Sequence, residues 1–296
     1  MIFNLRNSII LFSLMIIILM GSLTIYSVTS IDINYFLRFL LINIFVILLV
    51  VLLFNQINLN RIFSFGWLLF LFNILLVLSV EIFGKEINGS KRWLDFGFLS
   101  LQPSEFMKIT YAIFAIQYLR FYSFKFSKFR TIFLLLVLFL SAVPIIAQPD
   151  LGTGLVYIFL GLMFLFICGM HRLYFISMGI FGVLLSPLIY SFGLTSYQKG
   201  RIVSWFSSDQ TLSEKWNILQ SEISIGSGGF SGEGFLNSKQ NEFNFLPEAD
   251  TDFIFSIYAE QFGFIGVFLI LLSLGCFIVM TTLLTMTEKR LTSDSV

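Results

Sequence analysis

The sequence has 296 residues, of which 57% are hydrophobic and only 12% charged, and this composition excludes a soluble globular protein and indicates an integral membrane protein. The formal net charge of +1 provides no overall field that would attract nucleic acid. The only histidine, His171, excludes a histidine-based metal site and a Ser-His-Asp triad.

Apolar runs of about 17–25 residues predict membrane-spanning helices. The predicted fold is an all-α polytopic membrane protein with about eight transmembrane helices in one membrane domain over 1–296. The last run would be about 48 Å long as one helix, which exceeds the membrane core of roughly 30 Å. We therefore expect its first turns, with Asp252 and Glu260, to project from the membrane. The runs are residues 8–29, 36–54, 62–82, 104–120, 131–147, 152–170, 173–192 and 253–284.

Basic residues in the short loops predict that both termini lie in the cytoplasm. The strongest signal is RFYSFKFSKFR (120–130), which we interpret as a topology anchor, with contact to anionic lipid as the alternative. This topology places two long segments outside the cytoplasm, namely 83–103 and 193–251. The second is a large extracytoplasmic loop between the seventh and eighth helices.

The first outer segment contains cations beside an aromatic residue and a pair of opposite charges. Lys91 and Arg92 adjoin Trp93, which suits a site at the level of the lipid headgroups where cations meet phosphate. Further along, Glu105 and Lys108 are three residues apart at a predicted helix start, so they share a face and can pair. A functional ion pair and a structural salt bridge both remain open.

Two further polar clusters lie at the same predicted side of the membrane. In QPDLGTG (148–154), Asp150 is placed to cap the following helix. In YQKGRI (197–202), Lys199 and Arg201 are two residues apart, a spacing that suits a diphosphate and is also common among rim charges.

The long outer loop ends in a glycine-rich stretch and an acidic stretch. Glycines in IGSGGFSGEGF (225–235) permit tight turns, so this stretch is either a flexible loop or a positioning loop over a substrate cleft. Glu248, Asp250 and Asp252 then crowd the start of the last apolar run. Acids beside hydrocarbon are costly, which favours a functional role.

NGSKRWLDFGFLSLQPSE, QPDLGTG, QSEISIGSGGFSGEG and FLPEADTDFIF…AEQFGFIG occur in this order. Together they resemble the SEDS family of bacterial cell-wall polymerases, the RodA/FtsW/SpoVE group, and RWLDFGF is most similar to RodA. The resemblance implies a peptidoglycan glycosyltransferase of the bacterial inner membrane. Such an enzyme polymerises lipid II during cell elongation, together with a class B penicillin-binding protein and the elongation machinery.

The resemblance also implies roles for individual residues. The aspartate of the TDF motif is the family's proposed catalytic base, and that position is Asp252 here. We expect inverting transfer, with Lys108, paired with Glu105, orienting Asp252. The substrate-binding candidates are Lys91, Arg92, Glu105, Lys108, Lys199, Arg201 and Glu248. No dedicated metal ligand set is evident, and assistance by a divalent cation (Mg²⁺ or Mn²⁺) is left open.

Two departures from the family pattern bear on function. Family members usually have ten spans, and the last two carry the motif TG…LPF…SYGGSS. These two helices and this motif are missing from the eight transmembrane helices predicted here. The usual histidine before TDF is Asp250. The alternatives to an active polymerase are a lipid II transporter and an inactive truncated scaffold.

Overall fold

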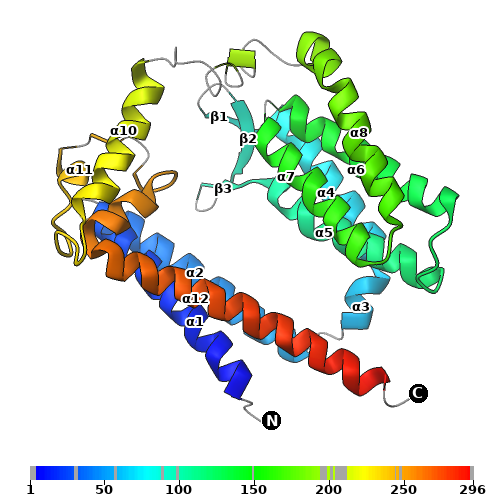
Figure 1. Cartoon of the computed structure of the whole chain (residues 1–296), viewed down its shortest axis with the longest axis horizontal. Coiled ribbons are helices and arrows are strands. Elements are labelled where there is room, and N and C mark those ends of the chain that lie inside the picture. Colours follow the sequence, from blue (N-terminus) through cyan, green and yellow to red (C-terminus); the bar gives the residue numbers. More distant parts are fainter. Residues whose placement is uncertain are drawn as a thin grey trace. The chain divides into compact units, whose positions relative to one another are not determined.

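A computed structural model of the chain describes residues 5–29, 33–56, 59–87, 90–97, 100–148, 150–193, 199–200, 203, 212–243, 245–246 and 249–293 (Figure 1). The chain divides into two compact units, which are described separately. The first unit joins Met1–Val51 to Asp209–Val296, and the second comprises Leu52–Ser208.

The first unit is built on two long apolar helices from opposite ends of the chain. Helix α1 (Leu5–Val28) packs along α12 (Ile254–Ser293), and α10 (Leu212–Ser227) packs against α12 as well (Figure 1). Helix α2 (Ile33–Gln56) follows α1, and the short α11 (Lys239–Glu242) follows α10. A small buried cluster of Leu246, Ala249 and Ile257 anchors the segment that leads into α12.

Helix α12 is interrupted at Gly263, so the prediction of one continuous helix over 253–284 is wrong at this point. Gly263 has φ 59° and ψ −162°, a conformation that is essentially restricted to glycine. A Cβ atom there would lie 2.3 Å from the backbone nitrogen of Gly232, so the close approach of the glycine-rich loop also requires glycine. The break separates a short first segment from the long helix that follows it.

The second unit contains one short helix and several long ones. They are α3 (Leu59–Ser64), α4 (Gly66–Phe83), α5 (Pro103–Phe121), α6 (Lys128–Ala147), α7 (Leu151–Ile167) and α8 (Arg172–Leu188), which continues into the π-helical turn η1 (Ile189–Gly193). Its core uses apolar side chains and tyrosines whose hydroxyls are satisfied: Tyr111 donates to Leu134 O (3.1 Å), and Tyr157 shares a hydrogen bond with Ser141 (2.6 Å). Gly161 lets α7 approach Leu138 of α6 closely.

Between α4 and α5 lies a small antiparallel sheet in the order β1-β2-β3. Strand β1 (Lys85–Ile87) pairs with β2 (Ser90–Asp95), which pairs with β3 (Ser100–Leu101). Sequence reasoning predicted only a loop for this outer segment. The dipeptide Asn88-Gly89, a pattern that predicts a turn, lies outside the described residues.

The predicted class, a helical polytopic membrane protein, is confirmed. Each of the eight predicted apolar runs falls on one or two helices. Among the described residues, five helices are long and apolar enough to cross a membrane: Ser8–Val28, Gly66–Phe83, Lys128–Ala147, Arg172–Gly193 and Ile254–Leu283. Phe36–Leu48 and Leu151–Ile167 are shorter apolar helices.

Candidate functional site

Strand β2 and the start of α7 are joined through Asp150. Its carboxylate caps α7 by accepting from Thr153 N (3.2 Å), as the sequence predicted, and it also accepts from Gln102 Nε2 (3.0 Å). Arg92 Nη1 lies 3.8 Å from the same carboxylate, which is only 6% exposed. The charge of Arg92 therefore already faces an acid, whereas the neighbouring Lys91 is exposed. Diphosphate binding by either residue stays a prediction.

The first turns of α5 carry the predicted ion pair. Pro103 opens the helix, and Lys108 Nζ lies 2.7 Å from Glu105 Oε2. The Glu105 side chain is 51% exposed and that of Lys108 is 21% exposed, so the pair is partly solvated. The pairing is confirmed. Its predicted action on Asp252, which belongs to the other unit, stays a prediction.

Lys199 is held near the end of η1. Its ammonium donates to Ser191 O (2.9 Å) and lies 5.8 Å from the centre of the Tyr190 ring. This arrangement keeps one cation at the outer end predicted for the seventh span. Arg201 and Glu248, the other predicted binding residues of the long loop, lie outside the described residues.

Asp252 lies in the turn that directly precedes α12. The turn is anchored by buried Ala249 on one side and buried Ile257 on the other, and Ser256 N donates to Phe253 O (3.0 Å) as the helix begins. Asp252 is exposed, whereas Asp250 is half-buried. A carboxylate at a helix N-terminus faces the positive end of the helix dipole. The fold therefore presents Asp252 to solvent from an anchored turn.

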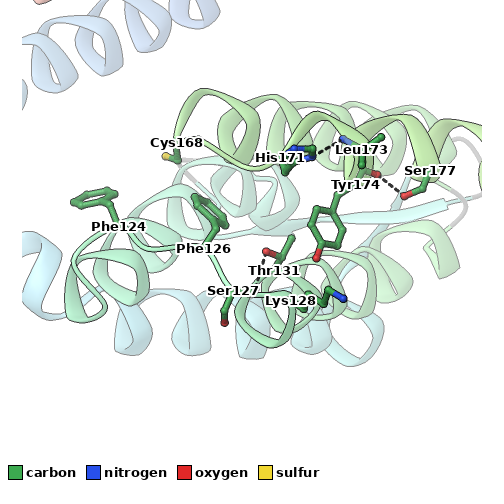
Figure 2. Close-up of a pocket in the computed structure, with 11 residues that line it drawn as sticks. Phe124, Phe126, Ser127, Lys128, Thr131, Cys168, His171, Leu173, Tyr174 and Ser177 are labelled. Carbon is green, nitrogen blue, oxygen red and sulfur yellow. Dashed lines mark hydrogen bonds between the residues drawn. The ribbon is translucent and has the colours of Figure 1, made fainter.

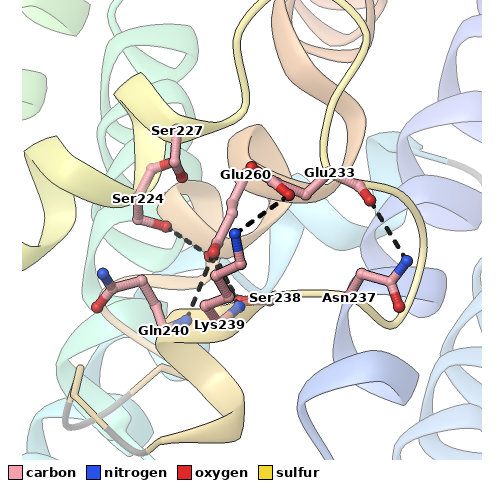
Figure 3. Close-up of polar contacts among 8 residues, drawn as sticks. All are labelled: Ser224, Ser227, Glu233, Asn237, Ser238, Lys239, Gln240 and Glu260. Carbon is pink, nitrogen blue, oxygen red and sulfur yellow. Dashed lines mark hydrogen bonds and ion pairs between the residues drawn. The ribbon is translucent and has the colours of Figure 1, made fainter.

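Glu260, in the first segment of α12, is 1% exposed and is therefore buried within the protein. Figure 3 shows its carboxylate among polar groups of other segments. The projection of this end of the helix from the membrane stays a prediction. Four donors from two other segments satisfy the Glu260 carboxylate. They are Ser224 Oγ (3.1 Å) and Ser238 Oγ (2.5 Å) to Oε2, and Lys239 N (2.9 Å) and Gln240 N (3.4 Å) to Oε1. This anchor was not predicted from the sequence, although an acid within an apolar run requires donors, and the polar segment NSKQNE contains three of the four.

The glycine-rich loop completes the hydrogen bonds of the interrupted helix. Breaking α12 at Gly263 leaves backbone groups without helical partners on both sides. The loop donates to the carbonyls before the break and accepts from the amides after it. The bonds are Glu233 N to Glu260 O (2.9 Å), Gly234 N to Gln261 O (3.2 Å), Phe264 N to Gly229 O (2.9 Å) and Ile265 N to Phe230 O (3.2 Å).

These contacts show that the described part of the glycine-rich stretch is docked on α12. Glycine is required where the loop touches α12: a Cβ on Gly228 would lie 2.1 Å from Ala259 O, and one on Gly232 would lie 2.1 Å from Gln261 O. The loop is thus docked on the helix, close to the segment that carries Asp252. The described geometry contradicts a freely flexible loop, and its position over a substrate cleft stays a prediction.

Among the described residues, no group of three or more His, Cys, Asp or Glu side chains could hold a metal ion. Assistance by a divalent cation therefore stays a prediction. The chemistry that the described residues offer is an exposed carboxylate in one unit and several cations in the other.

The sequence matches the family described as "Cell cycle protein", comprising FtsW, RodA and SpoVE, over residues 4–294. The peptidoglycan glycosyltransferase MrdB of Escherichia coli (strain K12) is 35% identical over 219 residues, which are 73% of this chain and 59% of that protein. The chain thus spans less than two thirds of this relative's length.

Two solved structures share the fold. A chain from a peptidoglycan synthase complex, described as coordinating polymerisation and crosslinking, superposes with a TM-score of 0.69 at 21% identity, covering 90% of this chain and 75% of that one. The rod shape determining protein RodA of Thermus thermophilus superposes with a TM-score of 0.62 at 23% identity, covering 91% and 72%. The chain therefore belongs to the FtsW/RodA/SpoVE family of cell cycle proteins and is a multi-pass membrane protein.

Proposed function

We propose that this protein is a peptidoglycan glycosyltransferase that polymerises lipid II, with Asp252 as its general base. The observation that carries the proposal is the family match over 4–294, combined with the exposure of Asp252 in the anchored turn before α12. The name of the E. coli relative supports the same reaction class.

In the proposed reaction, Asp252 accepts the proton of the acceptor sugar's 4-hydroxyl as that oxygen attacks the anomeric carbon of the donor. The bond between the anomeric carbon and the diphosphate breaks in the same displacement, so the configuration inverts. General-base assistance contributes typically about 10²–10⁴-fold to such a step. Cations stabilise the departing diphosphate, and Lys91, Arg92, Lys199 and Arg201 are the candidates.

The proposed setting is the bacterial inner membrane with both termini in the cytoplasm. The distribution of basic residues supports this orientation, which places Asp252 at the outer surface, where lipid-linked sugars are presented. A class B penicillin-binding protein is the proposed partner. The fold shared with a chain of a peptidoglycan synthase complex is compatible with that partner.

The test uses the full chain, purified in detergent and supplied with fluorescent lipid II, alone and with a class B penicillin-binding protein. Glycan chains on a gel are the expected product, and Asp252→Asn should eliminate them. Asp250→Asn is the matched control, because it removes a neighbouring carboxylate that the proposal does not use.

Three outcomes would contradict the proposal. Undiminished polymer from Asp252→Asn would exclude Asp252 as the base. Movement of lipid II across liposomes without polymer would favour the transporter instead. Absence of both activities in a correctly folded sample, even with the partner present, would favour a non-catalytic scaffold.

A further inference from the structure

A cavity of about 770 Å³ lies in the second unit, and its lining contains none of the residues assigned to the proposed reaction (Figure 2). It is lined by the loop between α5 and α6, the first turn of α6, the turn between α7 and α8, and the start of α8. Lys128 is the cation of its lining, and hydroxyls of Ser127, Thr131 and Tyr174 accompany it. Figure 2 shows the Tyr174 ring reaching from α8 toward Thr131 and Lys128 of α6.

The loop between α5 and α6 is held in a defined shape. Phe124, at φ 54°, donates its backbone N–H to Leu119 O (2.8 Å) at the end of α5. Arg130 then reaches back, donating from Nη1 to Lys125 O (2.8 Å) and lying 4.0 Å from the centre of the Tyr122 ring. This wall of the cavity is therefore preformed, which lowers the entropic cost of binding.

The turn between α7 and α8 forms the other wall and is equally well bonded. Gly169 adopts φ 103°, and Met170 N donates to Leu165 O (3.0 Å), which closes the end of α7. His171 Nδ1 accepts from Leu173 N (3.3 Å) and caps α8, as Ser127 Oγ accepts from Arg130 N (3.4 Å) and caps α6. Two helix N-termini thus begin at the cavity.

Charge around the cavity is of one sign. The residues that line the cavity lie within 124–131 and 168–177, and neither stretch contains an Asp or a Glu. Within the part of the chain that the structure describes, the Lys128 ammonium is exposed and has no acid partner. Arg130 and Arg172 lie close by in sequence. These charges and the helix ends favour an anion in the cavity.

The position and apolar lining of the cavity indicate which anion. The candidate spans Lys128–Ala147 and Arg172–Gly193 both begin at the cavity, so it lies at the level where a membrane-spanning segment meets the headgroups. Phe124, Phe126 and Leu173 add apolar surface to its lining. A soluble phosphate would gain nothing from these side chains, whereas a phospholipid presents a phosphate and apolar chains together.

We propose that this cavity binds the headgroup phosphate of an anionic phospholipid, with Lys128 as its charge partner and Tyr174 as a hydrogen-bond donor. The site lies at the membrane side that the basic residues predict to be cytoplasmic. The inference depends on the membrane insertion of the chain and not on its proposed enzymatic activity.

The test titrates the full chain, in neutral detergent, with short-chain phosphatidylglycerol or short-chain phosphatidylcholine, and counts bound lipid by native mass spectrometry. Lys128→Gln should lower the affinity for phosphatidylglycerol about fivefold, the effect of one cation near an anionic surface. Tyr174→Phe should lower it roughly threefold through the lost hydrogen bond, without changing charge. Lys125→Gln is the matched control, because it removes the same charge from the same loop outside the cavity lining, and it should change the affinity less than twofold.

Glycerol phosphate alone forms a separate arm of the experiment and should not compete at millimolar concentration. Competition there would assign the cavity to a soluble phosphate ester and overturn the lipid proposal. Equal losses in Lys125→Gln and Lys128→Gln would also overturn it, because they would indicate diffuse attraction to the loop, as would equal binding of the two lipids. Thermal melting of each variant confirms that a loss of binding is not a loss of fold.

Discussion

Two carboxylates of the same unit, Asp252 and Glu260, occupy opposite environments. Asp252 is exposed in a turn, whereas Glu260 is buried and accepts hydrogen bonds from α10 and from the segment around α11. A base must reach its substrate, and a buried acid must have its charge satisfied. The exposure of Asp252 is compatible with its proposed role as base, while Glu260 ties α10 to the segment around α11.

The strongest test of the different roles of Asp252 and Glu260 is to remove each carboxylate and to measure activity and stability separately. Asp252→Asn should lower the rate of lipid II polymerisation by about 10²–10⁴-fold, the usual contribution of a general base, and leave the thermal unfolding midpoint unchanged. A polymerisation assay and a melting curve on the same sample check both halves. A large fall in the midpoint would mean that Asp252 is structural.

Glu260→Ala, in contrast, should act first on stability. It leaves buried hydroxyls and backbone amides without their acceptor, and we expect the free energy of unfolding to fall by roughly 3 kcal/mol. The exposed Glu242 of α11 provides the control, since Glu242→Ala should change stability by less than about 0.5 kcal/mol. Equal melting of the two variants would refute the anchoring role of Glu260.

Substitution at the break in α12 should have a smaller effect on stability. Gly263→Ala places a Cβ against Gly232 and forces a conformation that alanine rarely adopts, so stability should fall by about 1–3 kcal/mol. Gly275 lies in the long part of the same helix, and a methyl group added there would have no atom within 4 Å outside its own helix backbone and chain neighbours. Gly275→Ala should therefore be neutral or stabilise by up to about 1 kcal/mol, and a thermal-shift comparison of the pair measures the effect of the break itself.

A third carboxylate, Asp95 of β2, lies between the two extremes, because it is exposed yet paired. A hydrogen bond from Lys85 Nζ (2.9 Å) and one from Gly97 N (2.9 Å) lower the pKa of Asp95 below its ordinary value of 3.8. The pair therefore stabilises the sheet above that value, and this small contribution is lost as pH falls through the lowered pKa. Lys85→Gln should raise the pKa of Asp95, which NMR titration of isotope-labelled aspartate measures; an unchanged pKa would contradict the role of Lys85.

Local features of the sequence predicted local features of the structure well. The helix start predicted near Glu105 is the start of α5, Asp150 caps α7, and Glu105 pairs with Lys108 because residues three apart share a helix face. Each of these depends on a few neighbouring residues. The site assignments of Asp252 and of the cations remain predictions, because they concern groups from both units.

Longer-range features were not accessible in the same way. The break at Gly263 and the burial of Glu260 both depend on partners that meet only after folding. The donors to Glu260 lie as far as 36 residues away along the chain. No periodicity in the sequence predicts such a meeting, although the acid within an apolar run signalled that donors were needed.

The sequence by itself determined the membrane class, the positions of the apolar spans and the family, because hydropathy and contiguous motifs are properties of short stretches. Only the tertiary structure decided which acids are exposed and which are anchored by hydrogen bonds. It also decided that two candidate spans begin at a preformed basic cavity. The physical reason is that burial and hydrogen-bond satisfaction depend on which segments pack together. The lipid bilayer favours a helix wherever the chain is apolar, but it does not determine which polar groups form hydrogen bonds with each other.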